Sequence, residues 1–276
     1  MNVLSPDEIE FFEQNGYVVV RAAVPAEQCQ AVIDAIFGFL GMDAAQPDGW
    51  YREPHRTNGF VELYHHPSMW ENRQTPRVYE AFAQLLGEEH LWVSIDRAGF
   101  KPPPHAAHPE YDDKGFVHWD ADTSDWPLPF SLQGVLYLND QSEEQGCYQC
   151  VPVMHRAFDE WVKGQPADRD PRNPDLTGLD VRQVAGKQGD LIIWTRALAH
   201  GNGHNVSDLP RFAQYITMSP AREDDTAARD QRIELFDQRQ PPPSAAFIGD
   251  PRGWEQQQQR AELSALGRQL LGLDRW

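Results

Sequence analysis

A histidine and an aspartate stand two residues apart in the segment His118-Trp119-Asp120. Side chains at positions i and i+2 of a β-strand leave the same face, so this imidazole and this carboxylate could reach one metal ion. A His-x-Asp pattern is common by chance, and a solvated histidine at a strand end would explain it equally well. The interpretation as a metal site therefore depends on a third ligand elsewhere in the chain.

A second histidine, His200, ends an apolar run that begins at Leu191, and Arg211 follows eleven residues later. Glycine and proline residues at 201, 203 and 210 indicate a reversal of the chain between them. The sequence resumes with strand character at Phe212, so a hairpin would return Arg211 close to His200.

Two imidazoles and one carboxylate on one face of an octahedral iron(II) leave three open positions. A bidentate 2-oxo acid and then dioxygen could occupy those positions. The far carboxylate of such an acid requires a planar, permanently charged partner, which an arginine provides and a lysine does not. Arg211 is the candidate for that role.

The composition excludes several classes of protein. The chain has 276 residues, 24 Lys and Arg against 42 Asp and Glu, and a net charge of −18. Such an acidic protein is unsuited to bind nucleic acid or an anionic membrane surface. No targeting signal or membrane-spanning segment is expected. Three cysteines are too few for a disulfide framework, so we expect a cytoplasmic protein.

The apolar patterns predict helices followed by short strands. Helical signals occupy residues 5–15, 25–40 and 75–87, and the region 91–220 contains short β-type runs typical of a sandwich or barrel. The five runs are 91–95, 133–138, 148–153, 191–194 and 212–218. Long connections at 101–117 and 158–182 are expected to be functional. We expect a surface wrap over 222–251, a last helix over about 254–271, and one domain over 1–276.

The chain resembles the phytanoyl-CoA dioxygenase family of Fe(II)- and 2-oxoglutarate-dependent oxygenases over nearly its whole length. The segments that carry the resemblance are Phe11-Phe12 to Tyr17, Phe100-Lys101-Pro102-Pro103, Gly146–His155, Gly189 through His200 to Arg211, and the tail ending at Trp276. The resemblance implies a mainly β fold with flanking helices, a double-stranded β-helix (jelly-roll, cupin-like). It also implies His118, Asp120 and His200 as iron ligands.

Further roles follow from the same resemblance. Arg211 is expected to bind the distal carboxylate of 2-oxoglutarate, and Lys101 is a further contact to this co-substrate. Dioxygen is the other co-substrate. The residue between the ligands of the family's His-x-Asp motif is usually glutamine, whereas here it is Trp119. The carboxylate of Asp120 favours hydroxylation, because related halogenases carry a small residue at that position.

The substrate side is less defined. Strand alternation would place Arg196 on the face of His200, where it could meet a substrate carboxylate, and Trp119 is a second candidate for substrate contact. Four lysines and a charge of −18 are unfavourable for the polyanionic part of an acyl-CoA. We expect hydroxylation of an unactivated C–H bond in a small metabolite, with 2-oxoglutarate converted to succinate and carbon dioxide.

Alternatives remain at this point. His204 competes with His200 as the distal ligand, although it lies only seven residues before Arg211. A group of Cys147, Cys150 and His155 has too few ligands for structural zinc. A catalytically silent jelly-roll that binds a metal or small ligand is the alternative function. A cupin-type hydrolase or isomerase would not require Arg211.

Overall fold

A computed structural model describes residues 3–276 of the chain, which form three antiparallel sheets and the helices around them. The six-stranded sheet has the order β1 (Tyr17–Val20), β9 (Leu191–Thr195), β6 (Leu132–Tyr137), β11 (Arg211–Tyr215), β4 (Ala98–Lys101) and β2 (Phe60–Val61). The four-stranded sheet has the order β5 (Phe116–His118), β10 (His200–Asn202), β7 (Tyr148–Cys150) and β8 (Arg182–Gln183). Strands β12 (Met218–Pro220) and β3 (Leu91–Val93) form a separate pair.

The helices are α1 (Pro6–Asn15), α2 (Ala26–Leu40), α3 (Pro67–Arg73), α4 (Pro76–Leu86), α5 (Pro152–Lys163), α6 (Thr226–Gln238) and α7 (Ala265–Leu271). Short 3-10 helices occupy Pro47–Trp50, Pro109–Tyr111, Thr123–Asp125 and Glu255–Gln257. None of the helices in the described part of the chain is long and apolar enough to cross a bilayer.

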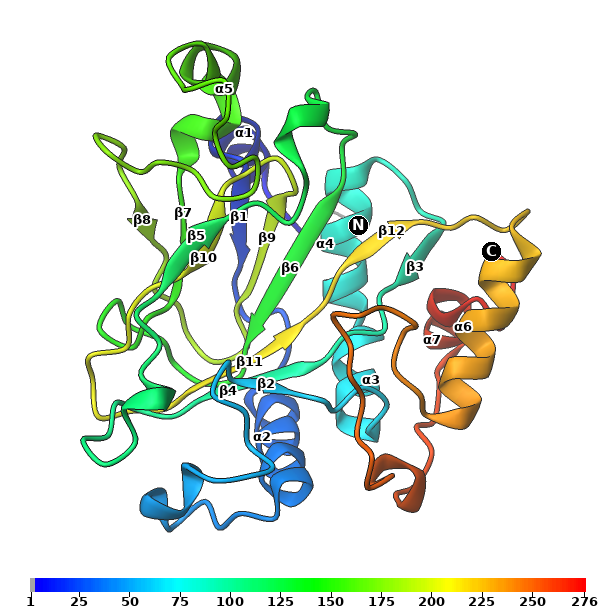
Figure 1. The fold of residues 1–276 in the computed structure, drawn as a ribbon. Coiled ribbons are helices and arrows are strands. Elements are labelled where there is room, and N and C mark those ends of the chain that lie inside the picture. The colour runs from blue at the N-terminus through cyan, green and yellow to red at the C-terminus, as the bar shows by residue number, and fades with distance from the viewer. Residues whose placement is uncertain (1–2) are drawn as a thin grey trace.

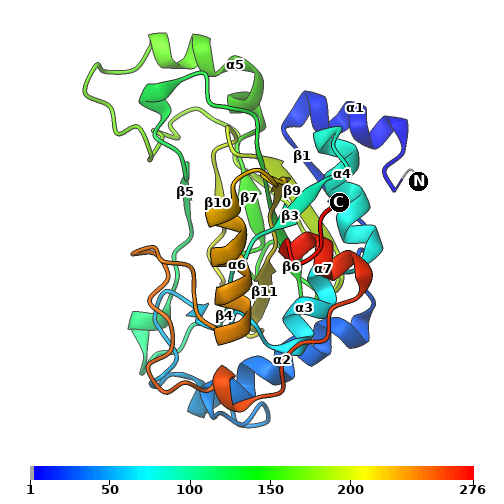
Figure 2. The same ribbon diagram turned by 90° about the vertical axis from the view of Figure 1, so that its right-hand side faces the viewer.

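The two larger sheets give the molecule a jelly-roll architecture. The four-stranded sheet lies to one side of β6, and the pair β3 and β12 lies with α6 and α7 to the other side (Figure 1). In the perpendicular view, β5 lies on the opposite side of β6 and β9 from α4 (Figure 2). Helices α2 and α4 pack on the outer face of the six-stranded sheet, and its inner face lies toward the four-stranded sheet. The predicted fold class, mainly β with flanking helices, is confirmed.

Local sequence explains the first helices. Ser5 caps α1: its side chain accepts a hydrogen bond from the Glu8 N–H, and the Glu8 carboxylate accepts one from the Ser5 N–H. Helix α2 buries one face, including Val32, Ile36 and Leu40, in the main hydrophobic core. Both helices end at glycines in the left-handed conformation, Gly16 and Gly41.

Three predicted elements were wrong. The strand expected over 148–153 ends at Cys150, because Pro152 begins helix α5. The segment 222–251 is not only a surface wrap: it contains α6, which buries only Phe236 and therefore shows no apolar stripe in the sequence. The helix expected over 254–271 is interrupted, and only Ala265–Leu271 is α-helical.

Tertiary contacts explain that interruption. The carboxylate of Glu255 accepts hydrogen bonds from the backbone N–H groups of Tyr64 (2.9 Å) and His65 (2.6 Å). Gln74 accepts the N–H of Ser264 at 2.8 Å, and Ser264 then caps α7. These contacts with distant residues fix an extended connection where local propensity favours a helix.

Candidate metal centre

Three side chains from the sequence motifs meet at one point. His118, Asp120 and His200 each offer a ligand atom, and these atoms lie within 4.8 Å of one another. The Nε2 atom of His118 lies 3.0 Å from Asp120 Oδ1, and the Nε2 atom of His200 lies 3.6 Å from Asp120 Oδ2. This is the only such group that the residues from 3 to 276 form. It is the donor set of two imidazoles and one carboxylate that suits a divalent iron.

Neighbouring groups orient the three side chains. The Nδ1 atom of His200 is 2.9 Å from the Leu198 carbonyl oxygen, so it donates there and leaves Nε2 free for a metal. Gln133 donates to Asp120 Oδ2 at 2.5 Å. Burial alone would raise the pKa of Asp120, but hydrogen bonds from His118 and His200 outweigh it and hold that pKa below the usual range. The carboxylate is therefore ionised, as a metal ligand must be.

Pairing of two short strands brings the histidines together. In the register of β5 and β10, His118 lies directly opposite His200, and Val117 lies opposite Gly201. A Cβ atom at Gly201 would be 1.8 Å from the Phe116 carbonyl oxygen, so only glycine allows the strands to approach this closely. Asp120 lies just beyond the end of β5.

His118, Asp120 and His200, called the metal group below, line a cavity of about 500 Å³ between the two larger sheets. Other lining residues come from strands of both larger sheets and from the loops around them. They include Asn58, Phe60, Asp96, Arg97, Lys101, Asp113, Phe116, Gln133, Tyr148, Trp194, Asn202, Arg211, Tyr215 and Phe247. The cavity is large enough for a co-substrate and a small organic molecule together.

The candidate co-substrate anchors lie at one end of this cavity, in register on adjacent strands. Arg211 of β11 pairs with Lys101 of β4, and both line the cavity. Arg211 is buried, and its Nε donates to the Gln141 side chain at 3.0 Å, which orients the guanidinium group. A buried, oriented guanidinium is suited to receive a carboxylate.

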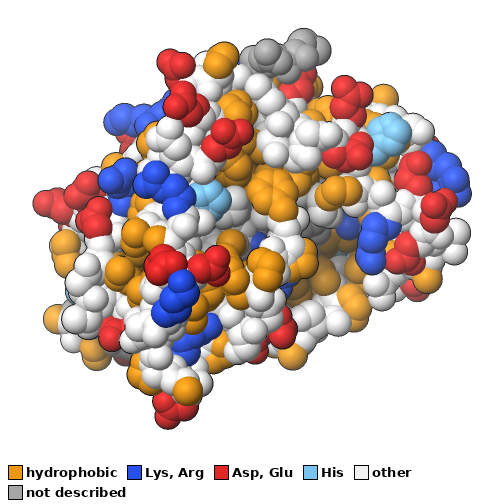
Figure 3. All heavy atoms as spheres, turned by 90° about the horizontal axis from the view of Figure 1, so that it is seen from above, with side chains coloured by type: hydrophobic (Ala, Val, Ile, Leu, Met, Phe, Trp, Pro, Cys, Tyr) orange, Lys and Arg blue, Asp and Glu red, His pale blue; other side chains and the backbone are white. Residues whose placement is uncertain are grey.

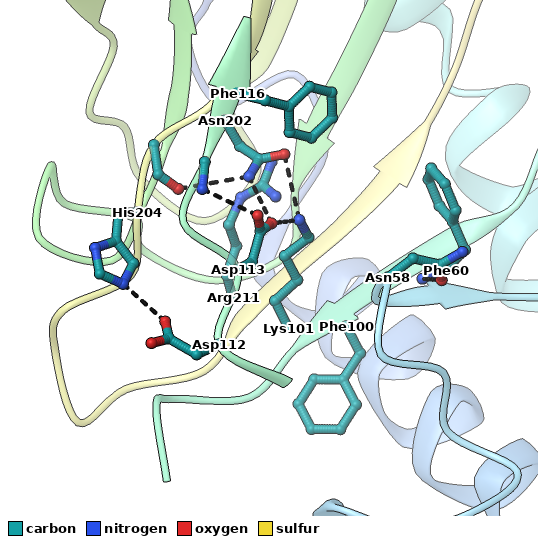
Figure 4. Close-up of polar contacts among 12 residues, drawn as sticks. Asn58, Phe60, Phe100, Lys101, Asp112, Asp113, Phe116, Asn202, His204 and Arg211 are labelled. Carbon is teal, nitrogen blue, oxygen red and sulfur yellow. Dashed lines mark hydrogen bonds and ion pairs between the residues drawn. The ribbon is translucent and has the colours of Figure 1, made fainter. Parts of the chain in front are cut away.

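Figure 4 shows a carboxylate already present among these cations. Asp113, from the loop between β4 and β5, forms an ion pair with Lys101 and accepts a hydrogen bond from Asn202 Nδ2 at 2.9 Å. Burial and the charge of Arg211 lower the pKa of Lys101 to about 7. The Asp113 carboxylate acts in the opposite sense, because it favours the protonated amine.

The two residues expected at the substrate lie elsewhere. Trp119 is 1% exposed, donates to the Ala197 carbonyl oxygen at 3.0 Å and packs against Phe158 and Trp161. It alternates away from the two ligands on either side of it. Arg196 is exposed and does not line the cavity. Its expected position assumed a continuous strand to His200, but β9 ends at Thr195 and a turn follows.

The competing ligands are also placed. His204 lies away from the metal group and pairs with Asp112 at 2.7 Å (Figure 4). Cys147 and Cys150 are fully buried among apolar side chains, and His155 contacts the Glu13 carbonyl oxygen. The connection 101–117 contributes Asp113 and Phe116 to the cavity, whereas the connection 158–182 contributes nothing to its lining.

The cavity also contains polar groups that the sequence motifs did not indicate. Gln133 contacts the metal group, Asp113 and Asn202 surround Lys101, and Asp96 lines the opposite end. The Nε1 atom of Trp194 is buried without a hydrogen-bond partner, so it can donate to a bound molecule. These residues lie in strands and loops with no local motif, and only the paired sheets bring them to one site.

The donor set fits the cofactors that the family resemblance implies. The Nε2 atoms of two imidazoles and an ionised carboxylate converge as iron(II) requires, and a buried arginine faces the same cavity as 2-oxoglutarate requires. The fold and the site thus define a jelly-roll protein with a His-Asp-His metal group.

The model of the family described as phytanoyl-CoA dioxygenase matches residues 12–213. The chain belongs to this family of 2-oxoglutarate-dependent enzymes. It is 25% identical over 260 residues to a Dictyostelium discoideum protein named "Putative phytanoyl-CoA dioxygenase", covering 76% of this chain and 74% of that protein. It is 26% identical over 249 residues to Ava biosynthesis cluster protein O of Aspergillus versicolor, covering 76% of each.

Solved structures share the fold at low sequence identity. GIG2 of Candida albicans superposes with a TM-score of 0.74 at 12% identity, covering 100% of this chain and 78% of that chain. The epimerase SnoN, in complex with Fe³⁺, α-ketoglutarate and nogalamycin RO, gives a TM-score of 0.57 at 19% identity, covering 95% and 97%. EvdO2 of Micromonospora carbonacea, complexed with 2-oxoglutarate, gives 0.53 at 18% identity, covering 79% and 92%.

Proposed function

We propose that this protein is an Fe(II)- and 2-oxoglutarate-dependent oxygenase that hydroxylates an unactivated C–H bond of a small molecule. The observation that carries the proposal is the convergence of His118, Asp120 and His200 in a cavity whose far end holds Arg211. Family membership supports it, as do the iron and 2-oxoglutarate complexes of proteins with the same fold.

In this assignment each residue has a defined task. His118, Asp120 and His200 hold the iron, and Gln133 keeps the Asp120 carboxylate in place. Arg211 binds the distal carboxylate of 2-oxoglutarate, with Lys101 as a second positive charge nearby. The aromatic walls exclude water from the reacting groups.

Bound iron(II), with 2-oxoglutarate and dioxygen, supplies the oxidising chemistry. One oxygen atom enters the substrate C–H bond as a hydroxyl group. The other enters succinate, while 2-oxoglutarate loses carbon dioxide. The protein determines which C–H bond is presented to the metal.

The test measures succinate formation. Protein loaded with Fe(II) without oxygen should form succinate when it receives 2-oxoglutarate and air, at least slowly in the absence of substrate. Asp120→Ala should abolish this turnover, because a methyl group cannot bind the metal. Binding of 2-oxoglutarate to the anaerobic iron form should also give a visible metal-to-ligand absorption band.

The result that overturns the proposal is the absence of both signals in the wild-type protein. A jelly-roll that only binds a metal or small ligand would then remain. Once a substrate is found, ¹⁸O₂ distinguishes hydroxylation from other outcomes, because only hydroxylation carries the label into the product. This matters because one protein with the same fold is described as an epimerase.

A further inference from the structure

The cavity has a second end, opposite the cationic one. Strands β4 and β11 run antiparallel along it, with Lys101 and Arg211 in register at one end. At the other end, the Tyr215 N–H donates to the Arg97 carbonyl oxygen at 3.2 Å. Four residues of strand separate these ends, a distance of roughly 13 Å. Asp96 lies beside Arg97 at this second end and lines the cavity.

Asp96 is a partly buried carboxylate that no cation pairs with. Its Oδ1 accepts the backbone N–H of Arg97 at 2.8 Å. No ion pair to Asp96 exists among the described residues 3–276. An ionised carboxylate can accept about four hydrogen bonds, so most of its capacity is open to the cavity. The charges of Arg97 and Arg73 offset only part of the cost of burying this carboxylate, because its pKa stays raised, which indicates a reason outside folding for its presence.

The two arginines nearest to Asp96 are committed to other groups. The Nη1 atom of Arg97 lies 3.5 Å from Glu62 Oε1, and its guanidinium lies between the rings of Phe60 (3.9 Å) and Phe247 (4.6 Å). Arg73 is fully buried and donates to the carbonyl oxygens of Tyr64 and Asp96. Neither guanidinium group forms an ion pair with the Asp96 carboxylate, so its oxygens can still accept hydrogen bonds from a bound molecule.

Aromatic side chains line the same cavity as Asp96. Tyr215 lies at the Asp96 end and Trp194 packs against His200, whereas Phe116 lies near Lys101 and the face of Phe60 is occupied by Arg97. Aromatic faces carry partial negative charge and attract cations as well as apolar groups. Burial raises the pKa of Asp96 to about 6, which still leaves it ionised at pH 7.5. A carboxylate within aromatic walls is the chemical complement of an organic ammonium ion.

We propose that Asp96 is the substrate-binding carboxylate of this protein and that the substrate is an organic amine, bound as its ammonium ion. The proposal rests on the proposed oxygenase function and specifies its substrate class. The 2-oxoglutarate anion then binds at Arg211, and the cationic group of the substrate binds at Asp96 at the other end of the cavity.

Matched small molecules test this assignment. The probes are 2-phenylethylamine, 2-phenylethanol and 3-phenylpropionate, with tryptamine and tryptophol as a larger pair. Binding to the anaerobic Fe(II) and 2-oxoglutarate form is measured at pH 7.5 by calorimetry, and stimulation of succinate formation is measured in air. A charged hydrogen bond is worth about 1.5–3 kcal/mol, so the amine should bind roughly 10- to 100-fold more tightly than its alcohol.

The informative variant is Asp96→Asn, which removes the charge but keeps an oxygen to accept the Arg97 N–H. It should fold, as thermal melting will show, and should lose the preference for amine over alcohol. Asp159→Asn is the matched control, because Asp159 is exposed on α5, lies outside the cavity and gives the same change in net charge.

Failure of this proposal is distinct from failure of the proposed function. If no amine binds more tightly than its alcohol, or if Asp96→Asn retains the preference, the assignment of Asp96 is wrong, whether or not succinate is formed. If amines bind through Asp96 but 2-oxoglutarate is neither bound nor consumed, the cavity binds cations and the oxygenase function is wrong.

Discussion

At the scale of single residues, the cationic end of the cavity contains a carboxylate of its own. Asp113 and Arg211 act on Lys101 in opposite directions, since the first favours the ammonium form and burial together with the second disfavours it. The charge state of Lys101 near neutral pH therefore depends on Asp113. That balance determines how many positive charges 2-oxoglutarate meets.

Replacing Asp113 by asparagine should shift the pH at which the binding of 2-oxoglutarate weakens. In the wild-type protein Lys101 loses its proton as the pH rises through about 7, and without the carboxylate the ammonium is lost at a lower pH. We expect the Kd for 2-oxoglutarate to rise about tenfold between pH 6 and pH 8.5 in the wild-type protein, and the rise to begin at a lower pH in Asp113→Asn. Titration of the absorption band of the anaerobic iron form measures this.

The double variant Asp113→Asn, Lys101→Met is the control for other titrating groups, including the histidines of the metal centre. Its pH dependence should match that of Lys101→Met alone. An equally steep rise in the double variant would show that Lys101 is not the responsible group.

At the scale of elements, the paired strands β5 and β10 position two of the three proposed metal ligands. Gly201 permits their close approach, because any side chain there would overlap the Phe116 carbonyl oxygen. We expect Gly201→Ala to lower the free energy of unfolding by at least about 2 kcal/mol and to weaken iron binding more than tenfold. Chemical denaturation and metal titration measure the two effects.

Gly49→Ala provides the comparison, since a Cβ atom there would contact nothing within 4 Å. It should change neither quantity appreciably. Loss of stability in Gly201→Ala with unchanged iron affinity would contradict the role assigned to this strand pair.

Local sequence patterns identified some residues of the site and missed others. His118 and Asp120 were identifiable from their spacing, although Asp120 lies just beyond the end of β5. The predicted hairpin between His200 and Arg211 is wrong, because β10 and β11 belong to different sheets, and the two residues instead line one cavity between the sheets. Arg196 was misplaced because a turn of a few residues reversed the alternation, which spacing alone does not reveal. Asp96 and Asp113 carry no motif at all, and only the packing of one sheet on the other brings them to the cavity.

At the scale of the whole molecule, acidic and basic side chains alternate around hydrophobic ones on the face seen from above (Figure 3). The net charge of −18 is thus not a guide to the cavity, where Lys101 and Arg211 line one end together with Asp113, and Asp96 lines the other beside Arg97. The expectation of one domain over 1–276 stays a prediction. A ligand that contacts both larger sheets can test whether its binding raises the thermal stability of the whole protein.

The metal group lies on the four-stranded sheet and at its edge, whereas Arg211 and Lys101 lie on the six-stranded sheet. A metal ion with 2-oxoglutarate bound to it would connect the two. A ligand at 100 times its Kd stabilises the native state by about 2.7 kcal/mol, which for a chain of this size raises the Tm by about 5–10 °C. We expect Fe(II) alone to raise the Tm, 2-oxoglutarate alone to have little effect, and both together to exceed the sum. In anaerobic thermal melts, Asp120→Ala should remove both the shift caused by Fe(II) and the larger shift of the combination. An equal shift from 2-oxoglutarate without metal would place its binding site on one sheet only.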